Sequence, residues 1–118
     1  MDGDDFVAQN AYYHLAECYL KLDRKQEALN AFRNAARMEF NPDIQKDALL
    51  NYARLSYEIG NAYQPVPEVL GSYLQAYPED KYASEIRELL VDSYLTSRNF
   101  KGALELLESN RGYASAET

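Results

Sequence analysis

The sequence is organised around a row of small and large apolar residues at helical spacing, which occurs near both ends of the chain. In the first copy the row follows the i, i+3, i+4, i+7 rule that places residues on one face of a helix. Its members are Tyr12, Leu15, Ala16 and Tyr19. A matching row on the next predicted helix contains Ala28, Phe32 and Ala35. A hairpin of two such helices cannot bury its apolar face alone, so it must stack on copies of itself.

Two further copies of this pattern are present. The residues that lie 75 positions after Leu15, Ala16, Tyr19, Ala28 and Phe32 are all apolar. They are Leu90, Val91, Tyr94, Ala103 and Leu107. A copy between these two consists of Tyr52, Ala53 and Ser56, followed by Val69, Tyr73 and Ala76. The chain is therefore predicted to be all-α and to contain about three helix–turn–helix units.

The repeat resembles the tetratricopeptide repeat (TPR) family, whose helix–turn–helix unit is about 34 residues long with an aromatic, Leu, small, Tyr … Ala … Phe … Pro signature. The resemblance implies a right-handed α-solenoid in one domain, residues 1–118, with repeats at about 9–42, 46–78 and 84–111. The second unit departs from the pattern, because Ser56 replaces the Tyr, Val69 replaces the Ala and the connection is four residues longer. Residues 112–118 are expected to start a further repeat or form a disordered tail, as in a fragment of a longer protein.

Helix-capping and helix-breaking residues indicate where the helices begin and end between the apolar rows. Asn41-Pro42-Asp43 predicts a helix start, since Asn is a good N-cap and Pro is tolerated in the first turn. Gly60-Asn61 predicts a helix end. Residues 1–5 are expected to be disordered. The expected helices are about Phe6–Leu22, Lys25–Met38, Pro42–Ile59, Pro67–Ala76, Asp80–Ser97 and Phe100–Ser109.

Charge and hydropathy exclude several classes of function. The formal net charge of −7 argues against nucleic acid, which requires a basic surface, and against an anionic membrane surface. No apolar run approaches the length of about 18 residues that a membrane span needs. The lone Cys18 excludes an internal disulfide.

Candidates for catalytic chemistry are few. His14 and Cys18 have the i, i+4 spacing of metal ligands, but the chain has no further His or Cys, so we favour a packing role in which Cys18 is buried. The carboxylate pairs all lie at positions expected to face water: Glu79 with Asp80, Glu85 with Glu88, and Glu105 with Glu108. No phosphate loop or nucleophile motif is present. The sequence therefore predicts no enzyme activity, no cofactor and no metal.

The resemblance implies a partner-binding surface. In TPR proteins the first helix of each hairpin lines a concave groove that holds segments of other proteins. On this sequence the groove positions include an apolar strip and a set of charged residues. The predicted partner-binding residues are Tyr13, Glu17, Leu20, Leu50, Arg54, Tyr57, Glu58, Glu88, Asp92 and Leu95. Tyr13 and Tyr57 lie outside the core pattern, and each is interpreted either as a partly exposed residue or as a binding anchor.

The charges of these positions indicate the kind of partner. Carboxylates outnumber the cations there, and the Lys/Asn/Arg cluster with which chaperone-binding TPR domains grip a C-terminal carboxylate is missing. A basic or apolar protein segment is therefore favoured over an acidic one. The alternatives are spacer repeats with no partner site of their own, or a groove that packs against missing repeats or another copy. Self-association through exposed repeat ends is also expected.

A shorter motif suggests a location. Residues 77–83, Tyr-Pro-Glu-Asp-Lys-Tyr-Ala, resemble the Tyr-Pro-x-Ser-x-Tyr-Ala joint of envelope TPR proteins in Gram-negative bacteria, with Asp80 as N-cap in place of Ser. The resemblance implies a periplasmic or envelope scaffold whose signal sequence lies upstream, with the cytoplasm as the alternative.

Overall fold

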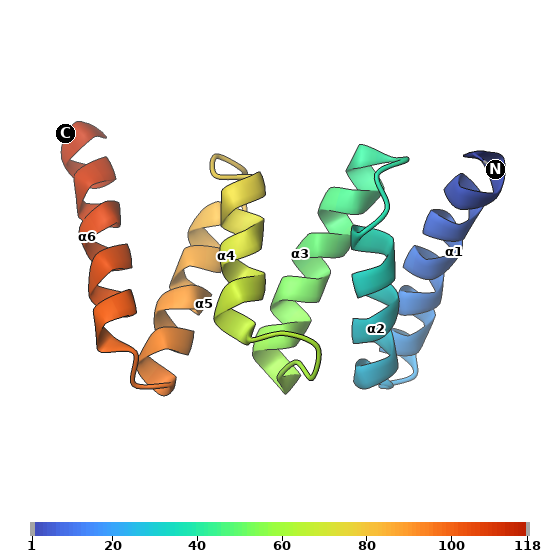
Figure 1. Ribbon diagram of the computed structural model, residues 1–118, viewed down its shortest axis with the longest axis horizontal. Coiled ribbons are helices and arrows are strands. Elements are labelled where there is room, and N and C mark those ends of the chain that lie inside the picture. The colour runs from blue at the N-terminus through green and yellow to red at the C-terminus, as the bar shows by residue number, and fades with distance from the viewer. Residues whose placement is uncertain (1, 118) are drawn as a thin grey trace. The chain divides into compact units, whose positions relative to one another are not determined.

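The described part of the chain is all-α, which confirms this part of the predicted fold class (Figure 1). The computed structural model describes the backbone of residues 2–117 and the side chains of residues 7–108. Six helices follow one another within that part of the chain. They are α1 (Asp2–Lys21), α2 (Lys25–Ala36), α3 (Pro42–Ile59), α4 (Val66–Ala76), α5 (Ala83–Thr96) and α6 (Phe100–Glu117).

The predicted caps of α3 are confirmed. Asn41 is extended and its Oδ1 accepts hydrogen bonds from the backbone N–H groups of Asp43 (3.1 Å) and Ile44 (3.3 Å). At the other end Gly60 adopts φ 84°, a left-handed conformation that a side chain would disfavour. Local chemistry therefore fixes both ends of this helix.

Three predicted boundaries were wrong. The first helix begins at Asp2 rather than Phe6, and the last extends beyond Ser109 to Glu117. Asp80 does not cap α5, which begins at Ala83; its Oδ2 instead accepts from the Tyr82 N–H (3.1 Å) and the Tyr73 hydroxyl (2.6 Å) in the turn before the helix. The further repeat at residues 112–118 stays a prediction, because these side chains lie outside the described residues.

The chain forms two compact units, Met1–Gln64 and Pro65–Thr118. The first contains α1, α2 and α3, and the second contains α4, α5 and α6. The boundary between them falls inside the second predicted repeat. The arrangement of the hairpins as a solenoid stays a prediction.

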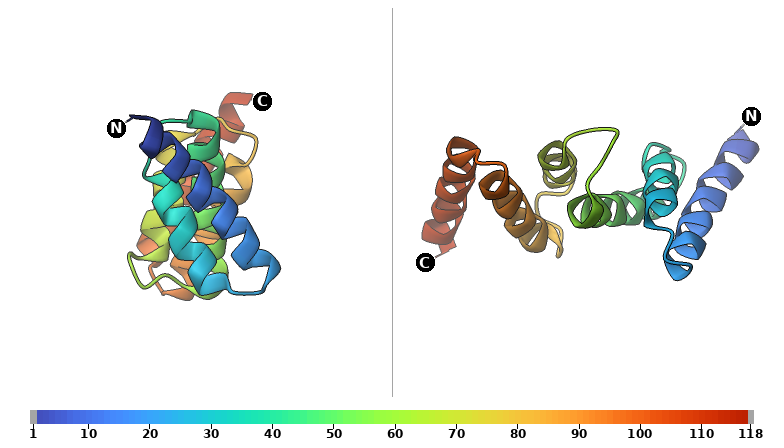
Figure 2. Two further views of the ribbon diagram at one scale, coloured as in Figure 1. Left: turned by 90° about the vertical axis from the view of Figure 1, so that its right-hand side faces the viewer. Right: turned by 90° about the horizontal axis from the view of Figure 1, so that it is seen from below.

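In the first unit α2 lies beside both α1 and α3 (Figure 2). The small residues predicted to allow close approach, Ala16, Ala28 and Ala35, are fully buried, and Phe32 is 1 % exposed. Two expectations for α1 need correction: Leu15 is 43 % exposed, and Tyr12 and Tyr19 are only half-buried. The core therefore lies on both sides of α2, while part of the apolar row on α1 faces outward.

A buried glutamine joins the three helices of this unit. The Gln9 side chain on α1 is fully buried. Its Nε2 donates to the carbonyl oxygens of Met38 (2.6 Å) and Ala35 (3.3 Å), just at the end of α2. Its Oε1 accepts from the backbone N–H of Asn41 (2.8 Å), the N-cap of α3. One side chain thus satisfies backbone groups at both ends of the connection between α2 and α3.

The long connection after α3 is fixed by the residue that breaks the repeat. Ser56 is fully buried, and its Oγ accepts a hydrogen bond from Asn61 Nδ2 (2.9 Å). Asn61 Nδ2 also donates to the Tyr52 hydroxyl (2.8 Å), which in turn donates to Gln64 Oε1 (3.0 Å). A Tyr in place of Ser56 would occupy the space that Asn61 needs. The substitution and the insertion are therefore two parts of one arrangement.

The second unit has a smaller described core. Its fully buried residues are Val69, Leu70, Tyr73 and Ile86, with Ala83, Leu90 and Ala103 nearly so. Ala76 is exposed and Tyr94 is half-buried, so both lie outside the core that the repeat pattern predicted. Leu107, which corresponds to the buried Phe32, is 44 % exposed.

We predict that Gln9→Leu lowers the free energy of unfolding by about 2 kcal/mol, because it leaves the partly buried Met38 carbonyl and Asn41 N–H without their side-chain partner. Urea unfolding followed by circular dichroism measures this change. Gln26→Leu at an exposed position on α2 is the control and should shift stability by less than about 0.5 kcal/mol. Equal effects of the two substitutions would contradict a structural role for the Gln9 side chain.

Candidate binding surface

The predicted groove residues of α1 and α3 meet through Tyr13. Its hydroxyl donates a hydrogen bond to Asp47 Oδ2, and its ring packs edge-on against Phe32 with 6.0 Å between the ring centroids. Burial, the hydrogen bond to Asp47 and the negative charge of that carboxylate raise the pKa of Tyr13 above its ordinary value of about 10. Tyr13 therefore ties α1 to α3, and its hydroxyl is already engaged within the chain.

The other predicted residues of α1 are accessible. Glu17 is exposed and its Oε1 lies 3.0 Å from Nδ1 of His14, whose side chain is 69 % exposed. Leu20, three residues further on, is 37 % exposed. Because positions 13, 17 and 20 share one helix face, an apolar group and a carboxylate lie beside the Tyr13 tie.

The predicted residues of α3 divide into buried and accessible ones. Leu50 is only 3 % exposed, so it belongs to the core and its assignment to an accessible apolar strip was wrong. Arg54 is half-buried, whereas Tyr57 is 38 % exposed. Glu58 Oε1 accepts from Lys25 Nζ (2.8 Å) on α2, and this bond raises the pKa of Lys25. Of the two apolar side chains predicted on this helix, Tyr57 is the one available to a partner.

The remaining predicted residues lie on α5, in the second unit. Glu88 and Asp92 are exposed, and Leu95 is 45 % exposed. Spaced at i, i+4 and i+7, they share one face of the helix. By itself α5 thus presents the same combination of carboxylates and one apolar side chain as α1.

Cys18 does not occupy the position expected of it, whereas His14 is exposed on the same helix. Cys18 is exposed, which corrects the prediction that it packs as a small buried residue. Among the described residues, no group of three or more His, Cys, Asp or Glu side chains is placed to hold a metal ion. The pair is therefore a feature of the surface of α1.

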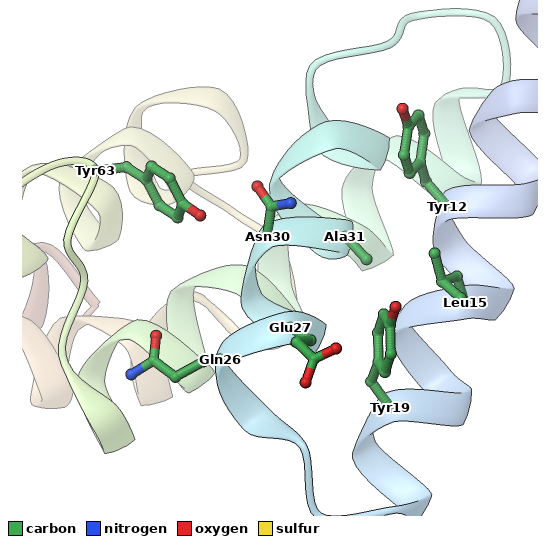
Figure 3. A pocket seen from close by; sticks show the side chains of 8 residues that line it. All are labelled: Tyr12, Leu15, Tyr19, Gln26, Glu27, Asn30, Ala31 and Tyr63. Atoms are coloured by element: carbon green, nitrogen blue, oxygen red, sulfur yellow. The ribbon is translucent and has the colours of Figure 1, made fainter.

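Sequence reasoning missed a cavity on another side of the first unit. It has a volume of about 420 Å³ and is shown in Figure 3. Tyr63, from the long connection, lies at its rim and its ring stacks on the Arg33 guanidinium at 4.5 Å from the centroid. The lining residues are Tyr12, Leu15, Tyr19, Gln26, Glu27, Asn30, Ala31 and Tyr63. The apolar row that was expected to be core forms one wall of it.

Comparisons with models of protein families, with curated proteins and with solved structures give no match. A proposal of function therefore depends on the geometry described above and on the sequence motifs.

We predict that the burial of Tyr13, together with its bond to Asp47, makes the free energy of unfolding fall at alkaline pH. The unfolded tyrosine loses its proton near pH 10, whereas the folded one retains it to higher pH. The folded state then binds more protons, so the free energy of unfolding falls as pH rises above about 10. Tyr13→Phe should cost about 1 kcal/mol at neutral pH and should flatten that fall. An identical alkaline slope in the variant and the wild type would contradict this assignment.

Proposed function

We propose that the chain is a non-catalytic protein-binding module of the tetratricopeptide type, which holds a segment of a partner protein against α1 and α3. The observation that carries the proposal is the exposure of Leu20 and Tyr57 on helices that Tyr13 ties together. Partly exposed Tyr and Leu side chains beside charged groups provide the apolar anchors and polar rim that protein interfaces use.

The charges support a partner segment that is basic or apolar. Glu17 on α1 is exposed near Leu20, and Glu58 next to Tyr57 keeps a side chain that is 53 % exposed despite its bond to Lys25. A lysine or arginine in the partner would meet carboxylates on both helices, whereas an acidic segment would be repelled. On α5, in the second unit, Glu88 and Asp92 beside Leu95 offer the same chemistry.

The carboxylates described in the structure support binding rather than acid–base catalysis. Glu79, Glu85, Glu88, Glu105 and Glu108 are exposed to solvent. Asp80, which was also expected to face water, is instead half-buried, because its carboxylate is bonded in the turn before α5. General acid chemistry requires a carboxyl group with a raised pKa in an apolar pocket, and a solvated carboxylate lacks that environment.

For the cellular location we propose the envelope of a Gram-negative bacterium, on the basis of the joint at residues 77–83. There Asp80 accepts hydrogen bonds from the Tyr73 hydroxyl and the Tyr82 N–H, and these bonds fix the turn before α5. In the part of the chain that the structure describes, no helix combines the length and apolarity required to span a membrane.

The binding proposal is tested by selecting peptides from a random display library on the purified protein. We expect enrichment of peptides that combine Lys or Arg with apolar residues, and binding that weakens as salt is raised. Tyr57→Ala and Leu20→Ala should each weaken binding of a selected peptide about tenfold, as truncation of an interface anchor does.

Tyr63→Ala is the matched control, because Tyr63 is 50 % exposed but lies at the rim of the cavity rather than on the α1–α3 surface. Its affinity should stay within twofold of wild type. Selection of acidic peptides, or equal affinities of all three variants, would contradict the proposed surface. Failure to enrich any peptide would favour the alternative, in which the repeats are spacers in a larger envelope array.

A further inference from the structure

The packing of α2 against α3 within the first unit provides a model for how two helix faces of this repeat fit together. Lys25 near the start of α2 binds Glu58 near the end of α3 (2.8 Å), and Gln45 near the start of α3 donates to the Ala36 carbonyl at the end of α2 (3.2 Å). The two helices therefore run antiparallel. On α2, Leu29 and Phe32 are buried to within 1 %. On α3, Ala48, Tyr52 and Leu55 are at most 5 % exposed.

On α6 the residues that correspond to the buried ones of α2 are exposed. Shifted by 75 residues, the positions of the buried Leu29 and Phe32 become Leu104 and Leu107, and the position of the half-buried Lys25 becomes Phe100. The side chains of Phe100, Leu104 and Leu107 are 61 %, 57 % and 44 % exposed. Their i, i+4, i+7 spacing places them on one face, which we call the α6 stripe. Ala103, at the position of Ala28, is 2 % exposed, and α6 packs against α5 within its unit.

On α1 the residues that correspond to the buried ones of α3 are exposed as well. The positions of Ala48, Tyr52 and Leu55, moved back by 37 residues, are Ala11, Leu15 and Cys18. All three are exposed, Leu15 at 43 %. Leu22, four residues after Cys18, continues the row and is 65 % exposed. We call these four residues the α1 stripe.

We propose that the α6 stripe of one copy of this chain packs against the α1 stripe of a second copy, in the manner in which α2 packs against α3. The two stripes are the counterparts of surfaces that already fit each other within the chain, so a second copy is the occupant they favour. This contact uses a different face of α1 from Leu20 and does not depend on the proposed partner binding.

If α6 of one copy packs on α1 of another in the register of α2 on α3, no repulsive pair forms at the position of the Lys25–Glu58 bond. Phe100 stands 75 residues after Lys25, and Lys21 stands 37 residues before Glu58. The exposed Phe100 ring would therefore meet the Lys21 side chain, whose ammonium group and aliphatic stem both pack favourably on an aromatic face. Exposed apolar stripes of this kind mark association surfaces.

The contact joins two different surfaces, so it is heterologous and continues from copy to copy unless an end is blocked. Light scattering coupled to size-exclusion chromatography should show a wild-type mass that rises with concentration beyond a dimer. Leu15→Glu and Leu104→Glu should each give monomers, because each blocks one of the two stripes. Both substitutions are at exposed positions, and circular dichroism will verify that the variants remain helical.

Mixing the two blocked variants tests the pairing directly. The intact α6 stripe of Leu15→Glu should bind the intact α1 stripe of Leu104→Glu and form a dimer that grows no further. Leu20→Glu, on another face of α1, is the control and should associate as the wild type does. A wild type that is monomeric at every concentration, a Leu104→Glu variant that dimerises alone, or a mixture that stays monomeric would overturn the proposal.

Discussion

The structure of the first unit depends on one buried amide. A helix end leaves backbone carbonyl and N–H groups without intrahelical partners, and burying them unpaired costs about 1–3 kcal/mol each. Where α2 ends and α3 begins, Gln9 supplies both a donor and an acceptor from α1. The short connection can therefore lie against α1, and the small residues on α1 and α2 can pack closely. The two helices that carry the proposed binding surface take their positions from this arrangement.

Tyr13 acts one turn further along the same helix. Its bond to Asp47 holds α1 near α3 and uses up the polar group of an otherwise apolar side chain. The exposed groups beside it, Leu20 and Glu17, are then presented by a helix that is fixed at two points. A rigid support of this kind lowers the entropy that a partner must offset when it binds. The contacts that stabilise the unit therefore also support the proposed binding surface.

Much of the fold could be predicted from the sequence, since helical periodicity and cap chemistry act over a few residues. Asn41 and Gly60 were assigned correctly for that reason. Periodicity shows which residues share a face, but it does not show whether a neighbour covers that face. Leu15 was expected in the core but is exposed, and Leu50 was expected to be accessible but is buried. The structural roles of Gln9 and Asn61 were not predicted, because their hydrogen-bond partners cannot be recognised from local sequence. Gln9 binds backbone groups at the α2–α3 connection, and Asn61 binds side chains of α3.

The same internal repeat explains both the packing within the chain and the surfaces that remain open, and this is the central claim of the account. The most direct measurement is the rate at which the lone Cys18 thiol, in the α1 stripe, reacts with a neutral alkylating reagent as protein concentration is raised. If a second copy covers the stripe, the rate falls with concentration in the wild type and stays constant in Leu104→Glu. A rate that is independent of concentration in the wild type would contradict the account.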